Sequence, residues 1–326
     1  MGALEQLWST GPLQRGAAGM RAAARPRNPG RRAGRVMLSF VIVTFRSNAI
    51  LPRALASIPS GCEIILVDNP SDEDPAAVLG GRAARILRNA RNSGYGAACN
   101  RGVAAASHPL VVVMNPDVTL DPGAVEAFLA AAAAHPDVDF FSPTIFDETG
   151  RENARQQSWI EAWTRADRRR NPVALGGAGA DGLRFLHGAV FLARRTAYCA
   201  VGGFDERIFL YYEDDDLSWR ILRSGRTMRR VPGAVVRHQT GSSSGHGFGD
   251  LFRRGRHKKR SEIYIARKWG LCHSPASDLA VQAAKLAFYG VTLQVDRFAG
   301  ALGRLAALLG RPAEGRRTVP GAAPPH

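Results

Sequence analysis

The feature that most constrains the fold is a regular alternation of apolar strand segments and helical segments between residues 38 and 142. Strands that alternate with helices favour a mostly parallel sheet covered by helices on both faces. The strand segments are 38–45, 63–67, 84–87, 109–114 and 139–142, and helices are expected at 50–58, 74–79, 96–106 and 122–134. Because such sheets bind ligands at the carboxyl ends of their strands, the polar residues after each strand are the first candidates for a site.

The pattern changes after residue 145. Residues 147–182 are polar and rich in glycine, which indicates a loop or a segment that faces an acceptor. Residues 241–249 (GSSSGHGFG) indicate a loop that can close over a ligand. The remaining expected elements are strands at 185–193 and 228–236, helices at 214–224 and 252–268, and apolar helices within 277–309. The wide apolar faces of the last helices suit packing on the body, on a second subunit or on a membrane surface.

The chain has 326 residues, 45% of them hydrophobic, which is enough for one large or two small domains. Its four cysteines form no CxxC pair, which argues against a zinc ribbon, a thioredoxin-like site and a disulfide-stapled secreted domain. The predicted organisation is a disordered basic extension (1–36), a body (37–250), basic and amphipathic helices (251–310) and a disordered tail (311–326). Met37 directly precedes the first strand, and we hypothesise that it is the true start of translation.

The net charge of +16 is concentrated outside the body. Residues 1–36 carry seven arginines and one glutamate, and residues 253–268 carry eight basic residues and one acidic residue, whereas residues 37–252 carry 23 of each sign. This distribution suits an anionic membrane surface at least as well as nucleic acid. Because the basic segment has few interleaved aromatic residues, we expect no nucleic-acid partner. The residues expected to contact anionic lipid are Arg253, Arg254, Arg256, Lys258, Lys259 and Arg260.

Three polar clusters follow strands in the first half of the chain. Asp68 ends the second strand, where a carboxylate can accept a hydrogen bond from a base N–H or simply form an Asx turn. Residues 92–96 (NSGYG) combine glycines with a helix start, which suits a diphosphate or an ordinary loop before a small-residue helix. Asp117 stands at the exit of a buried strand, where a carboxylate can bind Mg²⁺ or Mn²⁺ or can precede a helix.

Residues 213–216 (EDDD) form an acidic run between aromatic residues and an amphipathic segment. Crowded carboxylates raise one another's pKa, which suits a general base. The alternative is a helix N-terminus whose acids complement the helix dipole, and both hold if one acid points into a cleft. His238 follows the last strand. Its position supports contact with a metal or a diphosphate and a purely structural role equally well. His187 has a weaker case.

These segments, in this order, resemble the inverting, nucleotide-sugar-dependent glycosyltransferases of family 2, and especially their bacterial rhamnosyltransferase-like branch. The resemblance covers about residues 38–245, and although each motif is weakly specific, six in order identify the family. The matching segments are VIVTF (41–45), ILVDNPSD (65–72), NARNSGYGAACNRG (89–102), VVVMNPDVTLDPGAVE (111–126), FLHGAVFLARRTAYCAVGGFDERIFLYYEDDDLSWRILRSG (185–225) and VPGAVVRHQTGSSSG (231–245). It implies an α/β fold of GT-A type, with a Rossmann-like, mostly parallel sheet flanked by helices and extended by C-terminal helices.

Carried over residue by residue, the resemblance implies a nucleotide-sugar site with a catalytic carboxylate. Asp214 would be the general base, and Glu213 and Asp215 are the neighbouring candidates. Asp117 would bind Mn²⁺ or Mg²⁺, and His238 would complete the metal or diphosphate site. The residues implied to bind the nucleotide sugar are Thr44, Arg46, Asp68, Asn92, Gly94, Asn100, Asn115 and Gly188.

The resemblance implies a metal-dependent enzyme that transfers a sugar from a dTDP- or UDP-linked donor, with dTDP-rhamnose as the first candidate. The acceptor would be a glycan or a lipid-linked glycan in bacterial cell-surface polysaccharide synthesis. The expected location is the cytoplasm, at the inner face of the plasma membrane. Whether the chain forms a homo-oligomer is left open. Arg46, Pro70 and Asp215 depart from the pattern of this branch, which leaves the nucleoside contacts and the position of the base open. A non-catalytic relative that binds a nucleotide or a glycan is the alternative.

Overall fold

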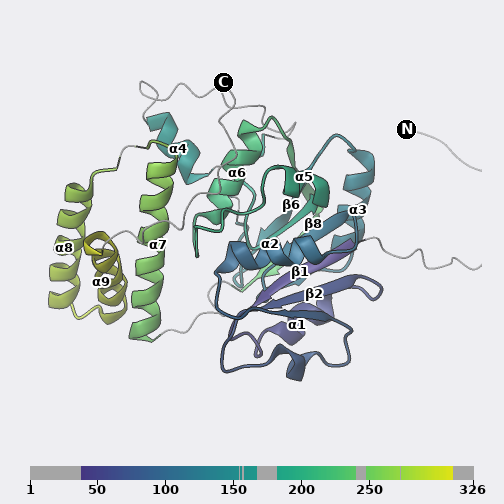
Figure 1. Ribbon diagram of the computed structural model, residues 1–326, viewed down its shortest axis with the longest axis horizontal. Helices are drawn as coiled ribbons and strands as arrows, with labels where there is room; N and C mark the ends of the chain where they lie inside the picture. The colour runs from purple at the N-terminus through teal and green to yellow at the C-terminus, as the bar shows by residue number, and fades with distance from the viewer. Residues whose placement is uncertain are drawn as a thin grey trace, which may run out of the picture. The chain divides into compact units, whose positions relative to one another are not determined.

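Strands and helices alternate along the computed structural model (Figure 1). The structure describes residues 38–153, 155, 158–166, 182–239, 247–271 and 273–310. Its strands are β1 (Leu38–Thr44), β2 (Glu63–Asp68), β3 (Arg85–Arg88), β4 (Leu110–Met114), β5 (Val118–Leu120), β6 (Phe140–Phe146), β7 (Val190–Arg194) and β8 (Met228–His238). Its helices are α1 (Leu51–Ser57), the 3₁₀ helix η1 (Pro75–Val78), α2 (Tyr95–Ala105), α3 (Ala124–Ala134), α4 (Trp159–Ala166), α5 (Arg195–Ala200), α6 (Glu213–Arg223), α7 (Phe248–Lys268), α8 (Pro275–Val291) and α9 (Val295–Leu309).

The strands of the described residues form one eight-stranded sheet in the order β3-β2-β1-β4-β7-β6-β8-β5. β3, β2, β1 and β4 are parallel to one another, and β6 is parallel to β8. β7 is antiparallel to β4 and β6, and β5 is antiparallel to β8. The predicted α/β fold with a mostly parallel sheet is therefore confirmed, and the antiparallel pairs all involve strands that follow β4.

β1, β2 and β4 end at the same edge of the sheet. Thr44 and Asp68, the last residues of β1 and β2, are register partners. Ile42 is the partner of Met114, the last residue of β4. The residues that follow β4 therefore lie near Asp68, at the edge where parallel sheets bind ligands.

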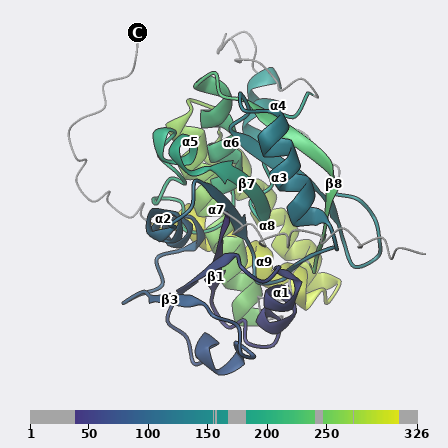
Figure 2. The same cartoon turned by 90° about the vertical axis from the view of Figure 1, so that its right-hand side faces the viewer.

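Apolar side chains fill both faces of the sheet. Leu51 of α1 and Phe128 of α3 are buried in one cluster, and Tyr198 of α5 is buried in the other. In Figure 2, α1 and α3 lie on one side of the strands and α2 and α5 on the other. The small residues of α2 allow close packing, because a Cβ on Gly102 would lie 2.3 Å from Cγ1 of Val41.

The second half of the chain differs from expectation in its short elements. β7 begins at Val190 rather than at residue 185, because its pairing with β4 covers only Val190–Arg194, and residues 185–189 form a loop. The predicted loop at 147–182 contains α4, and α5 and β5 were not predicted. These three elements have eight residues or fewer, so they show too little periodicity to be recognised in the sequence.

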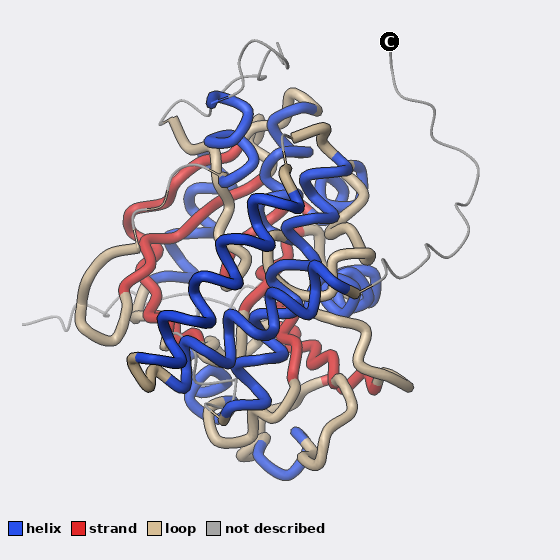
Figure 3. Tube along the Cα trace, turned by 90° about the vertical axis from the view of Figure 1, so that its left-hand side faces the viewer, coloured by secondary structure: helices blue, strands red, loops and turns tan. Residues whose placement is uncertain are grey.

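The last three helices form a bundle in which α9 contacts both α7 and α8 (Figure 3). Glycines bring α7 and α9 close together, because a Cβ on Gly255 would lie 2.2 Å from the carbonyl oxygen of Gly300. α7 begins at Phe248, so it includes the end of the loop predicted at 241–249. Within the described ranges, none of the helices combines the length and apolar character that a membrane span requires. The predicted extension (1–36), the tail (311–326) and loop residues 241–246 lie outside the described residues.

Candidate active site

The carboxylate of Asp68 is held in place at the sheet edge. The hydroxyl of Thr44 donates a hydrogen bond to Asp68 Oδ1 at 2.8 Å, and Nη1 of Arg88 donates to Asp68 Oδ2 at 3.2 Å. Asp68 and Thr44 are both buried. A buried carboxylate with a fixed orientation can accept a further hydrogen bond from the edge of a ligand, since each oxygen has two lone pairs.

The neighbouring Asn69 organises the loop that leads to α2. Its side-chain oxygen accepts hydrogen bonds from Nδ2 of Asn89 at 2.8 Å and from the backbone N–H of Ser93 at 3.2 Å. Asn92 in turn accepts a hydrogen bond from the backbone N–H of Gly94 at 3.0 Å. These amide contacts fix residues 92–94 beside Asp68, so the first two polar clusters predicted from the sequence are brought together.

Gly94 makes a close backbone approach that other residues could not make. Its φ is +87°, and a Cβ at this position would lie 2.4 Å from the carbonyl oxygen of Phe209. The backbone N–H of Tyr95 donates to the same oxygen at 3.0 Å. The start of α2 therefore contacts the loop that leads into the acidic run of α6.

Two residues predicted to bind the nucleotide sugar have other contacts. The side chain of Asn100 donates to the carbonyl oxygen of Phe204 at 2.9 Å and accepts from Tyr198 and from the backbone N–H of Phe204. Asn100 thus secures the loop after α5. Arg46 is exposed, and its Nε donates to Asp72 at 3.1 Å. The structure does not bring these two side chains into contact with the other candidates.

A second part of the site lies between β4, β5 and β8. Asp117 is buried, and its Oδ1 lies 3.3 Å from Nε2 of His238, the register partner of Val118. Among the described residues, neither this oxygen nor Oδ1 of Asn115 has a hydrogen-bond partner, although both are buried. A buried carboxylate oxygen without a hydrogen bond, next to an imidazole nitrogen, fits a divalent cation bound by oxygen and nitrogen ligands.

His187 lies beside this pair, and its ring meets the ring of His238 edge to face with centroids 5.7 Å apart. Burial lowers the pKa of His187, because it disfavours the imidazolium form, while the carboxylate of Asp214 acts in the opposite direction. His187 therefore stands between the His238–Asp117 pair and Asp214. The sequence alone did not single it out, because a lone histidine in an apolar segment gives no specific signal.

The four consecutive acids at the start of α6 have different surroundings. Asp216 is fully buried and is paired with Arg220 at 2.8 Å and with Lys268 at 2.6 Å. Asp215 is buried and accepts hydrogen bonds from Nη2 of Arg155 at 2.5 Å and from the backbone N–H of Trp159 at 2.6 Å. Their contacts to α7 and to the segment before α4 indicate structural roles.

Glu213 is buried without such a partner. Within the described part of the chain, its Oε2 accepts no hydrogen bond, and burial, reinforced by the charge of Asp214, raises the pKa of Glu213 to about 8. Burial and the charge of Asp214 also raise the pKa of Asp215 to about 7, against the lowering effect of Arg155. Burial therefore favours the protonated form of Glu213 near neutral pH more strongly than that of an ordinary surface acid.

Asp214 is the acid that is only half-buried and faces the loop before β7. Its Oδ2 accepts from the backbone N–H of Gly188 at 3.2 Å, and a Cβ on Gly188 would lie 3.0 Å from Cβ of Asp214. The hydroxyl of Tyr95 donates to the carbonyl oxygen of Gly188 at 2.6 Å. The backbone N–H of Asn115 donates to the carbonyl oxygen of Ala189 at 2.7 Å. Residues 187–189 thus join the base candidate to the strand that carries the metal candidates.

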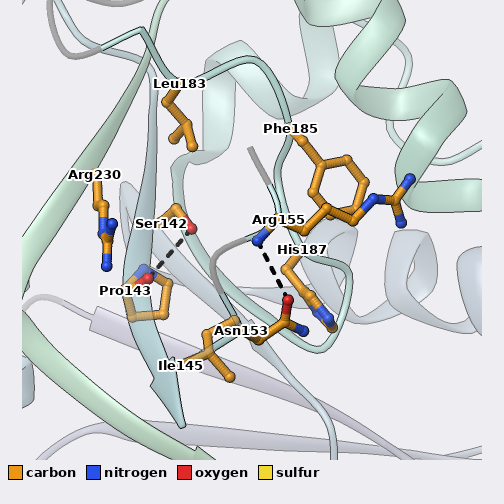
Figure 4. Close-up of a pocket in the computed structure, with 9 residues that line it drawn as sticks. All are labelled: Ser142, Pro143, Ile145, Asn153, Arg155, Leu183, Phe185, His187 and Arg230. Atoms are coloured by element: carbon orange, nitrogen blue, oxygen red, sulfur yellow. Dashed lines mark hydrogen bonds between the residues drawn. The ribbon is translucent and has the colours of Figure 1, made fainter. Parts of the chain in front are cut away.

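A small pocket opens next to this loop (Figure 4). His187 and Phe185 line one side of it, and Arg155 lies over the Phe185 ring with its guanidinium carbon 3.9 Å from the ring centroid. The remaining lining residues are Ser142, Pro143, Ile145, Asn153, Leu183 and Arg230. Arg155 is a site component that the sequence motifs did not indicate. Asn69 and Tyr95 lie within the motifs, but their contacts to distant segments were not predicted.

Comparisons with known proteins identify the family and the fold. The family model Glycosyl transferase family 2 matches residues 39–199. The chain is 34% identical over 249 residues to an N-acetylglucosaminyl-diphospho-decaprenol L-rhamnosyltransferase of Mycobacterium tuberculosis. The match covers 64% of this chain and 78% of that relative. The chain is 28% identical over 289 residues to a pre-mycofactocin glycosyltransferase of the same organism, and this match covers 85% of this chain and 56% of that relative.

The fold is similar to that of glucosyl-3-phosphoglycerate synthase from Mycobacterium tuberculosis, solved with Mn²⁺, uridine diphosphate and phosphoglyceric acid. The TM-score is 0.51 at 18% identity, over 74% of this chain and 81% of that chain. The family and the GT-A type of fold predicted from the sequence motifs are confirmed.

Proposed function

Since the chain belongs to glycosyltransferase family 2, we propose that it transfers a sugar from a nucleoside-diphosphate donor to an acceptor hydroxyl with inversion at the anomeric carbon. The observation that carries this proposal is the grouping of Asp214, His187 and the His238–Asp117 pair around one loop. This grouping places a carboxylate that can take a proton next to side chains suited to a charged diphosphate.

The donor nucleoside is assigned to the edge formed by β1 and β2. Asp68 would accept a hydrogen bond from a base N–H, and Thr44 and Arg88 hold its carboxylate in position for this contact. Residues 92–94 would line the diphosphate and the sugar. The rhamnosyltransferase relative supports dTDP-rhamnose as the first donor to test, with UDP-sugars next.

Asp117 and His238 are the residues that would hold Mn²⁺ or Mg²⁺. Their unsatisfied carboxylate oxygen and imidazole nitrogen lie 3.3 Å apart, and both belong to strand ends at the site. When bound, the metal would offset the negative charge that builds on the leaving diphosphate. The solved structure of the related fold with Mn²⁺ and uridine diphosphate supports this assignment.

Asp214 would act as the general base. Its carboxylate takes the proton of an acceptor hydroxyl, and the hydroxyl oxygen forms a bond to the anomeric carbon as the bond to the diphosphate oxygen breaks. The backbone N–H of Gly188 orients Oδ2 of Asp214 for this step. A single displacement inverts the anomeric configuration, so no covalent enzyme intermediate is needed.

The acceptor is assigned to the open side of the loop that carries Gly188, where the small pocket beside His187 and Phe185 lies (Figure 4). The name of the rhamnosyltransferase relative includes a lipid-linked diphosphate sugar, and this supports a lipid-linked acceptor in cell-surface polysaccharide synthesis. We assign the reaction to the cytoplasmic face of the membrane, where nucleotide sugars are available.

The test is a donor screen on the full chain. dTDP-, UDP- and GDP-sugars are incubated with Mn²⁺ or Mg²⁺ and a polyprenyl-diphosphate-linked sugar, and release of the nucleoside diphosphate is measured with and without EDTA. We expect release from one donor that stops with EDTA. Calorimetric donor binding without release would favour a non-catalytic relative, and the absence of donor binding would contradict the proposal.

A further inference from the structure

The turn between α8 and α9 exposes a cluster of large apolar side chains. Val291 and Leu293 are 85% and 83% exposed, and Phe288 and Val295 are 57% and 59% exposed. Residues 286–295 contain no charged side chain. Large apolar side chains that gather at one exposed point mark a surface that contacts another molecule or a membrane.

The conformation of this turn gives Leu293 no structural reason to be apolar. Its φ is +52°, in the left-handed region where glycine or asparagine is preferred at the end of a helix. The turn is nonetheless well hydrogen-bonded, since the backbone N–H of Gln294 donates to the carbonyl oxygen of Tyr289 at 3.0 Å. A strained leucine at the exposed point of a fixed turn does not serve the fold, which points to a role in binding.

Charged side chains of both signs follow the apolar turn. Asp296 and Arg297 come directly after it and are both exposed. On α7, Arg253 is exposed and pairs with Asp250 at 2.5 Å, and the neighbouring Phe252 packs against Gly303 of α9. Of the six residues expected from the sequence to contact lipid, Lys259 is excluded, because it is buried and its Nζ lies 2.6 Å from Glu262. The other five lie on α7, within the strongly basic segment 253–268.

The charge favours a lipid surface over a second copy of the chain. A two-fold interface at this end of the bundle would bring the same surface of two copies together, and with it the segment 253–268 of each copy, which carries eight basic residues and one acidic residue. An anionic bilayer instead offers an apolar interior to the turn and phosphates to the arginines.

We propose that the α8–α9 turn inserts into an anionic bilayer, with Phe288, Val291, Leu293 and Val295 at the acyl boundary and arginines at the phosphates. α7 connects this contact to the candidate active site, because His257 stacks on Phe209 with ring centroids 4.4 Å apart. The surface therefore sets the height of the site above the bilayer. This inference goes beyond the proposed function and does not depend on it.

The test measures binding of the full chain to vesicles of phosphatidylcholine alone and of phosphatidylcholine with phosphatidylglycerol, by co-sedimentation. We expect the wild-type protein to bind the anionic vesicles and Leu293→Asp to bind them about tenfold more weakly, because it loses apolar insertion and adds a negative charge. The matched control is Leu309→Asp at the other end of α9, where the leucine is 68% exposed, and its binding stays within about twofold of wild type.

Thermal unfolding of both variants checks that they fold. Equal vesicle binding by Leu293→Asp and wild type, or no binding by wild type, would overturn the proposal. Sedimentation velocity tests whether a second copy of the chain covers the turn. If the wild-type protein does not bind vesicles but forms a dimer that Leu293→Asp disrupts, the turn is a dimer interface. Release of nucleoside diphosphate in the absence of vesicles is measured separately, so a failure of docking is distinguishable from a failure of the proposed function.

Discussion

Asp214 differs from the acids beside it in what its carboxylate contacts. Asp215 pairs with Arg155, and Asp216 pairs with Lys268. Among the described residues, the carboxylate of Asp214 instead accepts hydrogen bonds from two backbone N–H groups, those of Gly188 and Asp215. An acceptor hydroxyl can therefore approach this carboxylate without displacing a cationic side chain. This difference favours Asp214 as the proposed base.

Replacing this carboxylate by an amide tests the assignment. We expect Asp214→Asn to lower kcat by about 10²- to 10⁴-fold, the range typical of a general base, with donor affinity nearly unchanged. Steady-state kinetics and calorimetry with the donor measure the two effects. The control is Glu148→Gln, an exposed acid after β6, which should leave kcat unaltered. Near-normal turnover by Asp214→Asn would move the base to another residue.

Glu213 makes a second prediction, on pH and stability. Its pKa is raised from 4.5 to about 8, so the folded state holds a proton that the unfolded state has released between these values. Folding stability therefore falls as pH rises through this window. We expect Glu213→Gln, which carries no charge, to raise Tm by several degrees at pH 8 and to change it little at pH 4.5.

Differential scanning calorimetry at the two pH values measures this effect. Asp72→Asn, an exposed acid paired with Arg46, serves as the control and should show no comparable pH-dependent gain. A stability difference between Glu213→Gln and wild type that is the same at both pH values would contradict the raised pKa. Retained turnover of Glu213→Gln would also separate this residue from the base.

At the scale of elements, α7 and α9 approach each other through glycines. A Cβ on Gly303 would lie 2.0 Å from the carbonyl oxygen of Phe252, whereas a Cβ on Gly300 would meet nothing within 4 Å. The two glycines are on the same helix, three residues apart, yet only the first is required by packing. Backbone atoms cannot move aside as a flexible side chain can, so the contact at Gly303 sets the distance between the helices.

We therefore expect opposite results from two alanine substitutions in α9. Gly303→Ala should destabilise the protein by about 1–3 kcal/mol, because the added methyl group forces the helices apart. Gly300→Ala should be neutral or stabilising by up to about 1 kcal/mol, because alanine favours the helix more than glycine does. Urea unfolding followed by circular dichroism measures both. Equal losses of stability would show that helix packing does not depend on the close approach at Gly303.

The sequence predicts these elements well where they are long and periodic. The strands that carry Asp68 and Asp117 were recognised because their apolar runs end in polar residues, and parallel pairing brings both ends to one edge. The role of His187 was not predictable, because it lies in a loop that has the composition of a strand. The contact between Tyr95 and Gly188 joins segments 93 residues apart, and no local pattern indicates it.

At the scale of the whole molecule, buried charges connect α7 to the body. Asp205 accepts hydrogen bonds from Arg207, from the hydroxyl of Tyr264 at 2.7 Å and from Nζ of Lys268 at 2.7 Å. Tyr264 and Lys268 belong to α7, and Lys268 also contacts Asp216 of α6. The helix that we connect to the lipid surface is thus fixed to the helix that carries the candidate base.

This network predicts how acid affects the protein. Although burial raises the pKa of Asp205, the hydrogen bonds from Arg207, Lys268 and Tyr264 outweigh it and hold the pKa well below its usual value. The stability that the carboxylate contributes is therefore present above the unfolded pKa of 3.8 and is lost as pH falls through the lower folded pKa. We expect Asp205→Asn to lower the free energy of unfolding by about 2–4 kcal/mol at pH 7.

Urea unfolding of wild type and Asp205→Asn at pH 7, 5 and 3 measures this prediction. The difference in free energy should be constant from pH 7 to pH 5 and should shrink by pH 3, because the Asp205 carboxyl of the unfolded wild-type chain then takes up a proton, which stabilises the unfolded state. Asp72→Asn is again the control. The Asp72 side chain is 75% exposed in its pair with Arg46, and exposed ion pairs contribute little to the free energy of unfolding. A difference that persists unchanged at pH 3 would mean that Asp205 stabilises the protein through its shape rather than its charge, and that its contacts to Tyr264 and Lys268 do not join α7 to the body electrostatically.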